Sequence, residues 1–93
     1  MPDPTPGDTT ENIRAVAEAL RLQRLAEINR SPRSREVLEA EYGRVWNTAE
    51  LVQEFAVVGF LAPFVAVRRQ TDGVLGSLEF QHFPRFYFNF QRA

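Results

Sequence analysis

Hydrophobic residues follow two different periods along the chain. Between residues 9 and 29 they recur every three or four positions, which is the period of an amphipathic α-helix. From residue 55 onward, β-branched and aromatic residues dominate, and many of them alternate with polar ones, as they do in strands. All eight phenylalanines lie in this second part. The pattern therefore predicts an α+β fold in which three helices precede a small antiparallel sheet.

The first helix is expected to run from Thr9 to Asn29. Asp8 and Glu11 have the spacing of a capping box, and Pro32 cannot continue a helix. One apolar stripe, expected to pack in the core, consists of Ile13, Val16, Ala17, Leu20 and Ile28. A second stripe on the far side consists of Ala15, Ala19, Leu22 and Ala26. A helix of a monomer usually needs one stripe, so the second reflects either alanine as a helix former or a partner-binding face.

Two short helices are expected next. Ser31 and Pro32 form a start signal for a helix that ends near Tyr42, with Gly43 as its C-terminal cap. The segment Asn47-Thr48-Ala49-Glu50 is a capping box that opens a helix from Thr48 to about Phe55. The uncharged run 55–67 then predicts buried strands, with Pro63 at a strand start or edge, and it is too short to span a bilayer.

Asp72-Gly73 marks a hairpin between two β-rich segments. A two-residue loop opposes Val67 with Leu78, and a four-residue loop keeps the same residues on each face because the side-chain period is two. The C-terminal strand follows Pro84, and its phenylalanines at 86, 88 and 90 are expected to share one aromatic inner face. The predicted core, covered by the first and third helices, comprises Ile13, Val16, Leu20, Leu51, Phe55, Val65, Val67, Leu78, Phe80, Phe86 and Phe88.

The length of 93 residues indicates a single domain, assigned to residues 9–93, after a Pro-rich leader at 1–8 that lacks the features of a secretory signal. There is no cysteine and one histidine, which excludes disulfides, thiolate metal sites and a multi-histidine metal site within one chain. No metal or cofactor is therefore predicted, and the cytoplasm is the default location. The formal net charge of −1 gives no global attraction to nucleic acid or to an anionic membrane.

No arrangement of residues in the sequence predicts catalysis. His82 is the only side chain that titrates near neutrality without help, and the hairpin places it on the apolar face, near the end of a strand. The same register points the nearby acids, Asp72 and Glu79, away from it. Since a general base needs a carboxylate or a nucleophile within reach, we predict that the protein is not an enzyme.

The charge is uneven along the chain. Residues 1–54 hold seven Arg and ten acidic residues, a net of −3, whereas residues 55–93 hold four Arg and two acidic residues, a net of +2. A cationic sheet with an exposed aromatic binds single-stranded nucleic acid in several folds. The residues that could form such a face are Arg68, Arg69, His82, Arg85, Tyr87 and Arg92. The second nucleic-acid hypothesis is a winged helix, in which segment 60–69 is the recognition segment and the hairpin is the wing.

The sequence favours a small, non-catalytic protein-interaction or assembly module, with a protein partner or a second copy and no membrane association. The second helical stripe and a short aromatic sheet with an open edge support this hypothesis. A nucleic-acid-binding module is the alternative.

Overall fold

The computed structural model describes residues 6–93, with side chains from residue 11 onward. The helices are α1 (Pro6–Arg30), α2 (Arg35–Tyr42) and α3 (Thr48–Glu54). The strands are β1 (Val45–Trp46), β2 (Phe55–Leu61), β3 (Phe64–Arg69), β4 (Leu75–Gln81) and β5 (Phe86–Arg92). They form one antiparallel sheet in the order β1-β5-β4-β3-β2. The predicted α+β class and the number of helices are confirmed, and the sheet includes a short strand, β1, that the sequence pattern does not predict.

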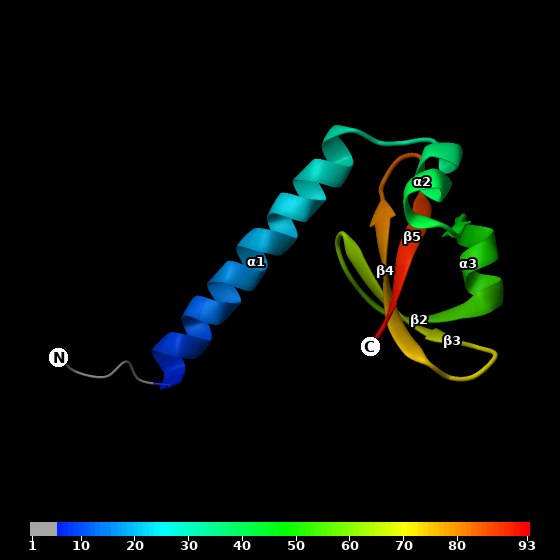
Figure 1. The fold of residues 1–93 in the computed structure, drawn as a ribbon. Helices are drawn as coiled ribbons and strands as arrows, with labels where there is room; N and C mark the ends of the chain where they lie inside the picture. The colour runs from blue at the N-terminus through cyan, green and yellow to red at the C-terminus, as the bar shows by residue number, and fades with distance from the viewer. Residues whose placement is uncertain (1–5) are drawn as a thin grey trace.

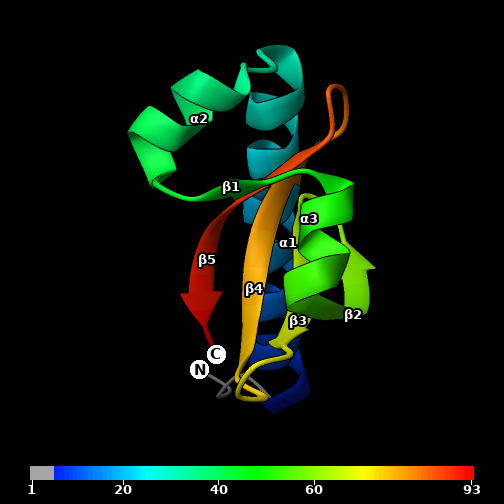
Figure 2. The same ribbon diagram turned by 90° about the vertical axis from the view of Figure 1, so that its right-hand side faces the viewer.

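The sheet lies between α1 on one side and α3 on the other (Figures 1 and 2). The larger core cluster lies on the α3 side and contains Trp46, Leu51, Phe55, Val65, Val67, Leu78, Phe80 and Tyr87. A smaller cluster on the other side joins the C-terminal part of α1 to α2 and the sheet through Ile28, Leu38, Val45 and Phe88. Toward its N-terminus, α1 diverges from the sheet (Figure 1).

The prediction that α1 contributes a long core stripe is wrong. Ile13, Val16 and Leu20 are 64%, 60% and 61% exposed, and only Ile28 of that stripe is buried. The reason is tertiary: α1 crosses the sheet with its last turns alone, on the face opposite to α3. The helix begins at Pro6, three residues before the predicted start, and the rest of the predicted leader, residues 1–5, lies outside the described part.

The short helices follow their local signals, with one correction. The N-cap of α2 is Ser34, whose hydroxyl accepts from the Val37 N–H at 3.3 Å, and not Ser31. Gly43 caps the other end with φ +83°, a backbone conformation that favours glycine. The predicted capping box of α3 is present, because Asn47 and Glu50 exchange side-chain-to-backbone hydrogen bonds of 2.9 and 2.8 Å.

The hairpin has the predicted faces and a longer loop. Val65 lies opposite Leu78 and Val67 opposite Gly76, so the register differs by two residues from that of a two-residue loop. The Arg69 N–H donates to the Val74 carbonyl at 2.8 Å and closes a four-residue loop. A shift of two residues preserves the alternation of side chains. Both registers therefore place the same four apolar residues inward, namely Val65, Val67, Leu78 and Phe80.

The C-terminal strand does not have the predicted single aromatic face. Asn89 adopts φ +58°, and the pairing of β4 with β5 shifts between Ser77 and Glu79. The alternation therefore changes sides, so that Phe88 packs in the α1–α2 cluster while Phe90 packs against the α3 cluster. Irregularities of this kind re-aim the side chains that follow them.

The uncharged run 55–67 was expected to form buried strands, and this is wrong for its first half. β2 is an edge strand, and its residues 56–61 are all exposed. The winged-helix hypothesis is also wrong in its geometry. Segment 60–69 forms the last residues of β2 and the whole of β3, and it contains no recognition helix.

A substitution at Gly76 tests the close contact between β4 and β5. A Cβ built at this position lies 2.5 Å from the Phe90 ring and 2.6 Å from the Gln91 carbonyl oxygen, so Gly76→Ala forces the strands to shift. We expect this substitution to lower the free energy of unfolding by about 1–3 kcal/mol. Gly59→Ala is the matched control, since its Cβ meets nothing within 4 Å. Urea unfolding of both variants checks the prediction, and equal midpoints would contradict it.

Candidate functional site

A polar network fixes the C-terminal half of α1 to the sheet. Arg24 donates from Nε to Glu79 Oε1 at 2.6 Å and from Nη2 to the Tyr42 hydroxyl at 2.7 Å. Asn89 donates to Glu79 Oε2 at 2.8 Å. Glu79 is only 7% exposed, so its carboxylate depends on these donors in place of water. The hydrogen bond with this carboxylate raises the pKa of the Arg24 guanidinium above its ordinary value.

Further contacts hold the segment after α1. The buried Gln81 amide accepts from the Arg33 N–H at 3.1 Å and donates to the carbonyls of Arg33 and Pro84 at 2.8 Å each. Arg21 donates to the Ala62 carbonyl in the β2–β3 turn. The anchored part of α1 therefore begins near Arg21, and the helix N-terminal to it has no buried residue among residues 11–20.

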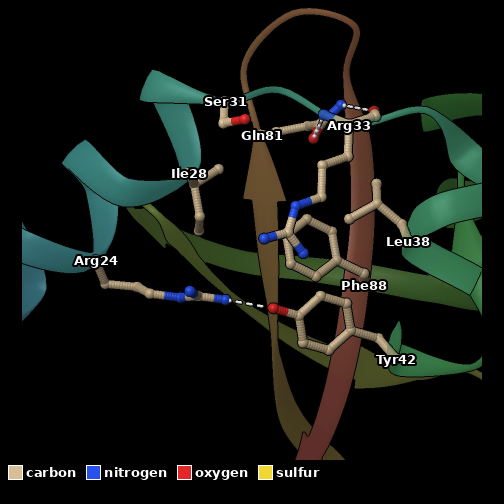
Figure 3. A pocket seen from close by; sticks show the side chains of 8 residues that line it. All are labelled: Arg24, Ile28, Ser31, Arg33, Leu38, Tyr42, Gln81 and Phe88. Atoms are coloured by element: carbon tan, nitrogen blue, oxygen red, sulfur yellow. Dashed lines mark hydrogen bonds between the residues drawn. The ribbon is translucent and has the colours of Figure 1, made fainter. Parts of the chain in front are cut away.

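A small pocket lies beside this network, between α1, α2 and the sheet (Figure 3). Its empty volume is about 240 Å³, including open solvent, and its enclosed part has room for about one water molecule. Figure 3 shows Arg24 reaching the Tyr42 hydroxyl at one end and Gln81 bonded to the Arg33 backbone at the other. The lining groups are engaged in holding the fold, so the pocket does not suit a substrate.

A second hollow, with an empty volume of about 710 Å³, lies between α2, α3 and β1. Its charged groups already neutralise one another. Arg35 pairs with Glu50 at 2.8 Å, and Arg44 donates to Glu54 at 3.0 Å. With both cations and both carboxylates paired, this hollow presents no free charge with which to hold an ionic ligand.

The helix surface is the first of two exposed apolar surfaces. It comprises the predicted partner-binding stripe together with the displaced core stripe: Ala15, Ala19, Leu22 and Ala26 with Ile13, Val16 and Leu20. Arg21 and Ile28 face the sheet. At 100° per residue, the stripe of Leu22 and its three alanines points away from them. The other three lie on a flank of the helix, so α1 presents apolar side chains on two sides.

The edge surface is the second apolar surface, and sequence reasoning missed it. It is formed by β2 and the neighbouring turn of α3, with Val52, Val57, Val58, Phe60 and Leu61 between 40% and 61% exposed. The signal was present, because a long uncharged run with a central glycine fits an edge strand as well as a buried one. Periodicity could not separate the two, since strand order depends on long-range pairing.

The proposed nucleic-acid residues do not form one patch. Arg68, Arg69 and Arg92 lie at the end of the sheet where β4 begins, since Arg68 is opposite Leu75 and Arg92 is opposite Gly76. His82 and Arg85 follow the far end of β4. Seven residues of strand separate the groups, which is about 20 Å.

Several of these side chains are already engaged. Tyr87 is 2% exposed in the core, where it cannot stack on a base. Arg69 forms a two-pronged pair with Asp72, whose pKa it lowers, and lies 5.4 Å from the Phe90 ring centre. Arg85 lies 4.7 Å from the ring centre of Phe80.

His82 does not lie on the apolar strand face as predicted. β4 ends at Gln81, whose side chain is buried. His82 lies in the turn that follows, and its side chain is exposed. Its Nδ1 lies 3.2 Å from Arg85 Nη2, with no carboxylate bonded to it among residues 11–93. The same residues contain no group of three acidic or histidine side chains that could hold a metal ion. Among the described helices, none is both long and apolar enough to cross a membrane.

Comparisons with protein families, curated proteins and solved structures find no match to this chain.

Glu79 tests whether the polar network holds α1. Removing this acceptor leaves Arg24 and Asn89 without their main partner, so we expect Glu79→Ala to lower the free energy of unfolding by about 2–3 kcal/mol. Residues 21–30 should then exchange their amide hydrogens faster. Glu27→Gln is the matched control, because Glu27 also approaches Arg24, at 3.4 Å, but from the exposed side. Urea unfolding and hydrogen exchange measure both effects, and a Glu79→Ala protein as stable as the control would contradict the prediction.

Proposed function

We propose that this protein is a non-catalytic protein-interaction module that binds its partner through the helix surface of α1. The observation that supports the proposal most directly is the exposure of Ile13, Val16 and Leu20, each at 60% or more, along one flank of α1. Contiguous exposed apolar surface of this kind marks interaction sites in soluble proteins.

The physics of an isolated helix supports the same conclusion. Helices shorter than about 12–15 residues are marginal in water, and residues 11–20 of α1 are all exposed, so packing within this chain does little to hold them in a helix. Complete burial of a Leu, Ile or Val side chain contributes roughly 1.5–3 kcal/mol. Burial of four large apolar side chains of α1 by a partner therefore offsets part of the cost of association and stabilises the helix.

The two-sided distribution of the stripes specifies the partner's shape. Leu22 and its alanine neighbours face away from the sheet, whereas Val16 and Leu20 lie on a flank. A flat surface covers only one of these sides. The partner is therefore a protein with an apolar groove, or a pair of its own helices, that encloses α1 on both sides. The small alanine side chains permit close helix–helix approach.

Leu22→Glu and Leu20→Glu place a carboxylate on either side of the helix surface. Both positions are exposed, so we expect the melting temperature to stay within about 2 °C of wild type and partner affinity to fall at least about tenfold. The matched control is Val37→Glu, at an exposed position on α2.

The partner is first identified with photoreactive residues at positions 20, 22 and 37 of the full chain. We expect one protein adduct from positions 20 and 22 and none from position 37, followed by loss of binding of that purified protein in the two α1 variants. Equal adducts from all three positions, or binding unaffected by the variants, would refute the proposal.

Binding to nucleic acid is the alternative, and a titration separates the two functions. With the arginines in two groups and Tyr87 buried, we expect weak binding to single- and double-stranded oligonucleotides at physiological salt, unchanged by Arg68→Ala with Arg69→Ala. Fluorescence anisotropy at two salt concentrations measures this. Sub-micromolar affinity with a log–log salt slope of about −0.7 to −0.9 per phosphate contact would instead favour the alternative.

A further inference from the structure

β2 combines three properties that an ordinary edge strand avoids. It is seven residues long, none of its side chains carries a charge, and Val58, Phe60 and Leu61 are 61%, 56% and 61% exposed. Natural edge strands are usually short or bear charges that prevent pairing with another chain. The opposite edge of this sheet follows that rule, because β1 has only two residues and leads directly into α3.

We propose that two copies of this chain associate through β2, side by side and antiparallel about a two-fold axis, so that the two sheets form one continuous sheet. This interface is distinct from the helix surface, and it stands or falls independently of partner binding by α1.

The absence of charge in β2 favours a second copy as the occupant. At a two-fold axis the central residue meets its own equivalent and its neighbours lie close to theirs, so a charged side chain there lies near a like charge. From residue 55 to residue 67 the chain has none. An interface with a different protein commonly uses complementary charges to select its partner, and β2 offers no charge for that purpose.

The side chains of β2 project from both faces of the strand, as a shared sheet requires. Val57 and Phe60 lie opposite Val67 and Val65, on the α3 side, and the Phe60 ring meets Phe80 edge-on at 5.6 Å. Leu61 lies on the other face. Pairing with a second β2 therefore buries apolar surface above and below the junction.

A bulge marks the centre of the strand. Val58 falls between Val57 and Gly59, where the pairing with β3 shifts, and it is the residue left out of the register. Val58 is the middle residue of this strand of 7 residues and is 61% exposed, so we place it at the two-fold axis of the dimer. It is the position at which a substitution should perturb association with the least effect on the fold.

Sedimentation velocity on the full chain tests the proposal. At a concentration on the order of 50 µM we expect wild type to sediment as a dimer of the 10.7 kDa chain. Val58→Lys should weaken dimerisation at least about tenfold, because it places two like charges at the axis. Val37→Lys, at an exposed valine on α2, and Leu22→Glu, on α1, should dimerise like wild type. Circular dichroism confirms that each variant is folded.

A charge-swap experiment makes the test specific to the two-fold axis. Val58→Lys and Val58→Glu should each be monomeric alone, and their equimolar mixture should recover the dimer, because unlike charges then meet. A monomeric wild type at this concentration would overturn the proposal, as would undiminished dimerisation of both Val58 variants. Failure of the mixture to associate would also overturn it. Loss of dimer with Leu22→Glu but not with Val58→Lys would assign self-association to α1 instead.

Discussion

The ion pair between Arg24 and Glu79 determines how the helical and sheet parts of this protein fit together. Glu79 lies on the sheet face that looks toward α1, and Arg24 bridges it to Tyr42 of α2. Asn89 of β5 completes the carboxylate's partners from a backbone position with positive φ. One buried carboxylate therefore connects two helices and two strands. Replacing such a pair with apolar residues often stabilises a protein. We therefore assign this ion pair the role of fixing one orientation of α1 relative to the sheet.

The position of this pair along α1 leaves residues 11–20 of the helix exposed. Contacts with the sheet begin near Arg21, and the smaller core cluster uses Ile28 alone from α1. The radius of gyration is 16.2 Å, whereas a compact chain of this length has about 12 Å. A domain of this size has material for a modest core, and α1 adds one buried residue, Ile28, to it among residues 11–30. Most of the large apolar residues that stay exposed lie on the helix surface and the edge surface.

These two surfaces suit different kinds of association. The helix surface is two-sided and bordered by charged residues such as Arg14 and Glu18, which suits insertion into another protein. The edge surface is uncharged and includes a strand with free backbone groups, which suits pairing with an identical strand. The two proposals are compatible, because association through β2 would leave α1 of each copy available to a partner.

Local chemistry in the sequence determined the helices, the α3 capping box, the even-numbered hairpin loop and the inward faces of β3 and β4. Each of these depends on neighbours a few residues apart, through hydrogen bonds to caps or a side-chain period of two. Only the tertiary structure decided three other features: α1 contributes Ile28 and not Leu20 to the core, β2 is an edge, and Tyr87 is buried. These three features depend on the strand order and on the irregularity at Asn89, where the side chains of β5 change faces. Both arise from contacts between residues far apart in sequence. The second stripe of α1 could be read from the sequence, but the edge surface could not, because an uncharged apolar strand has the same pattern at the centre of a sheet as at its margin.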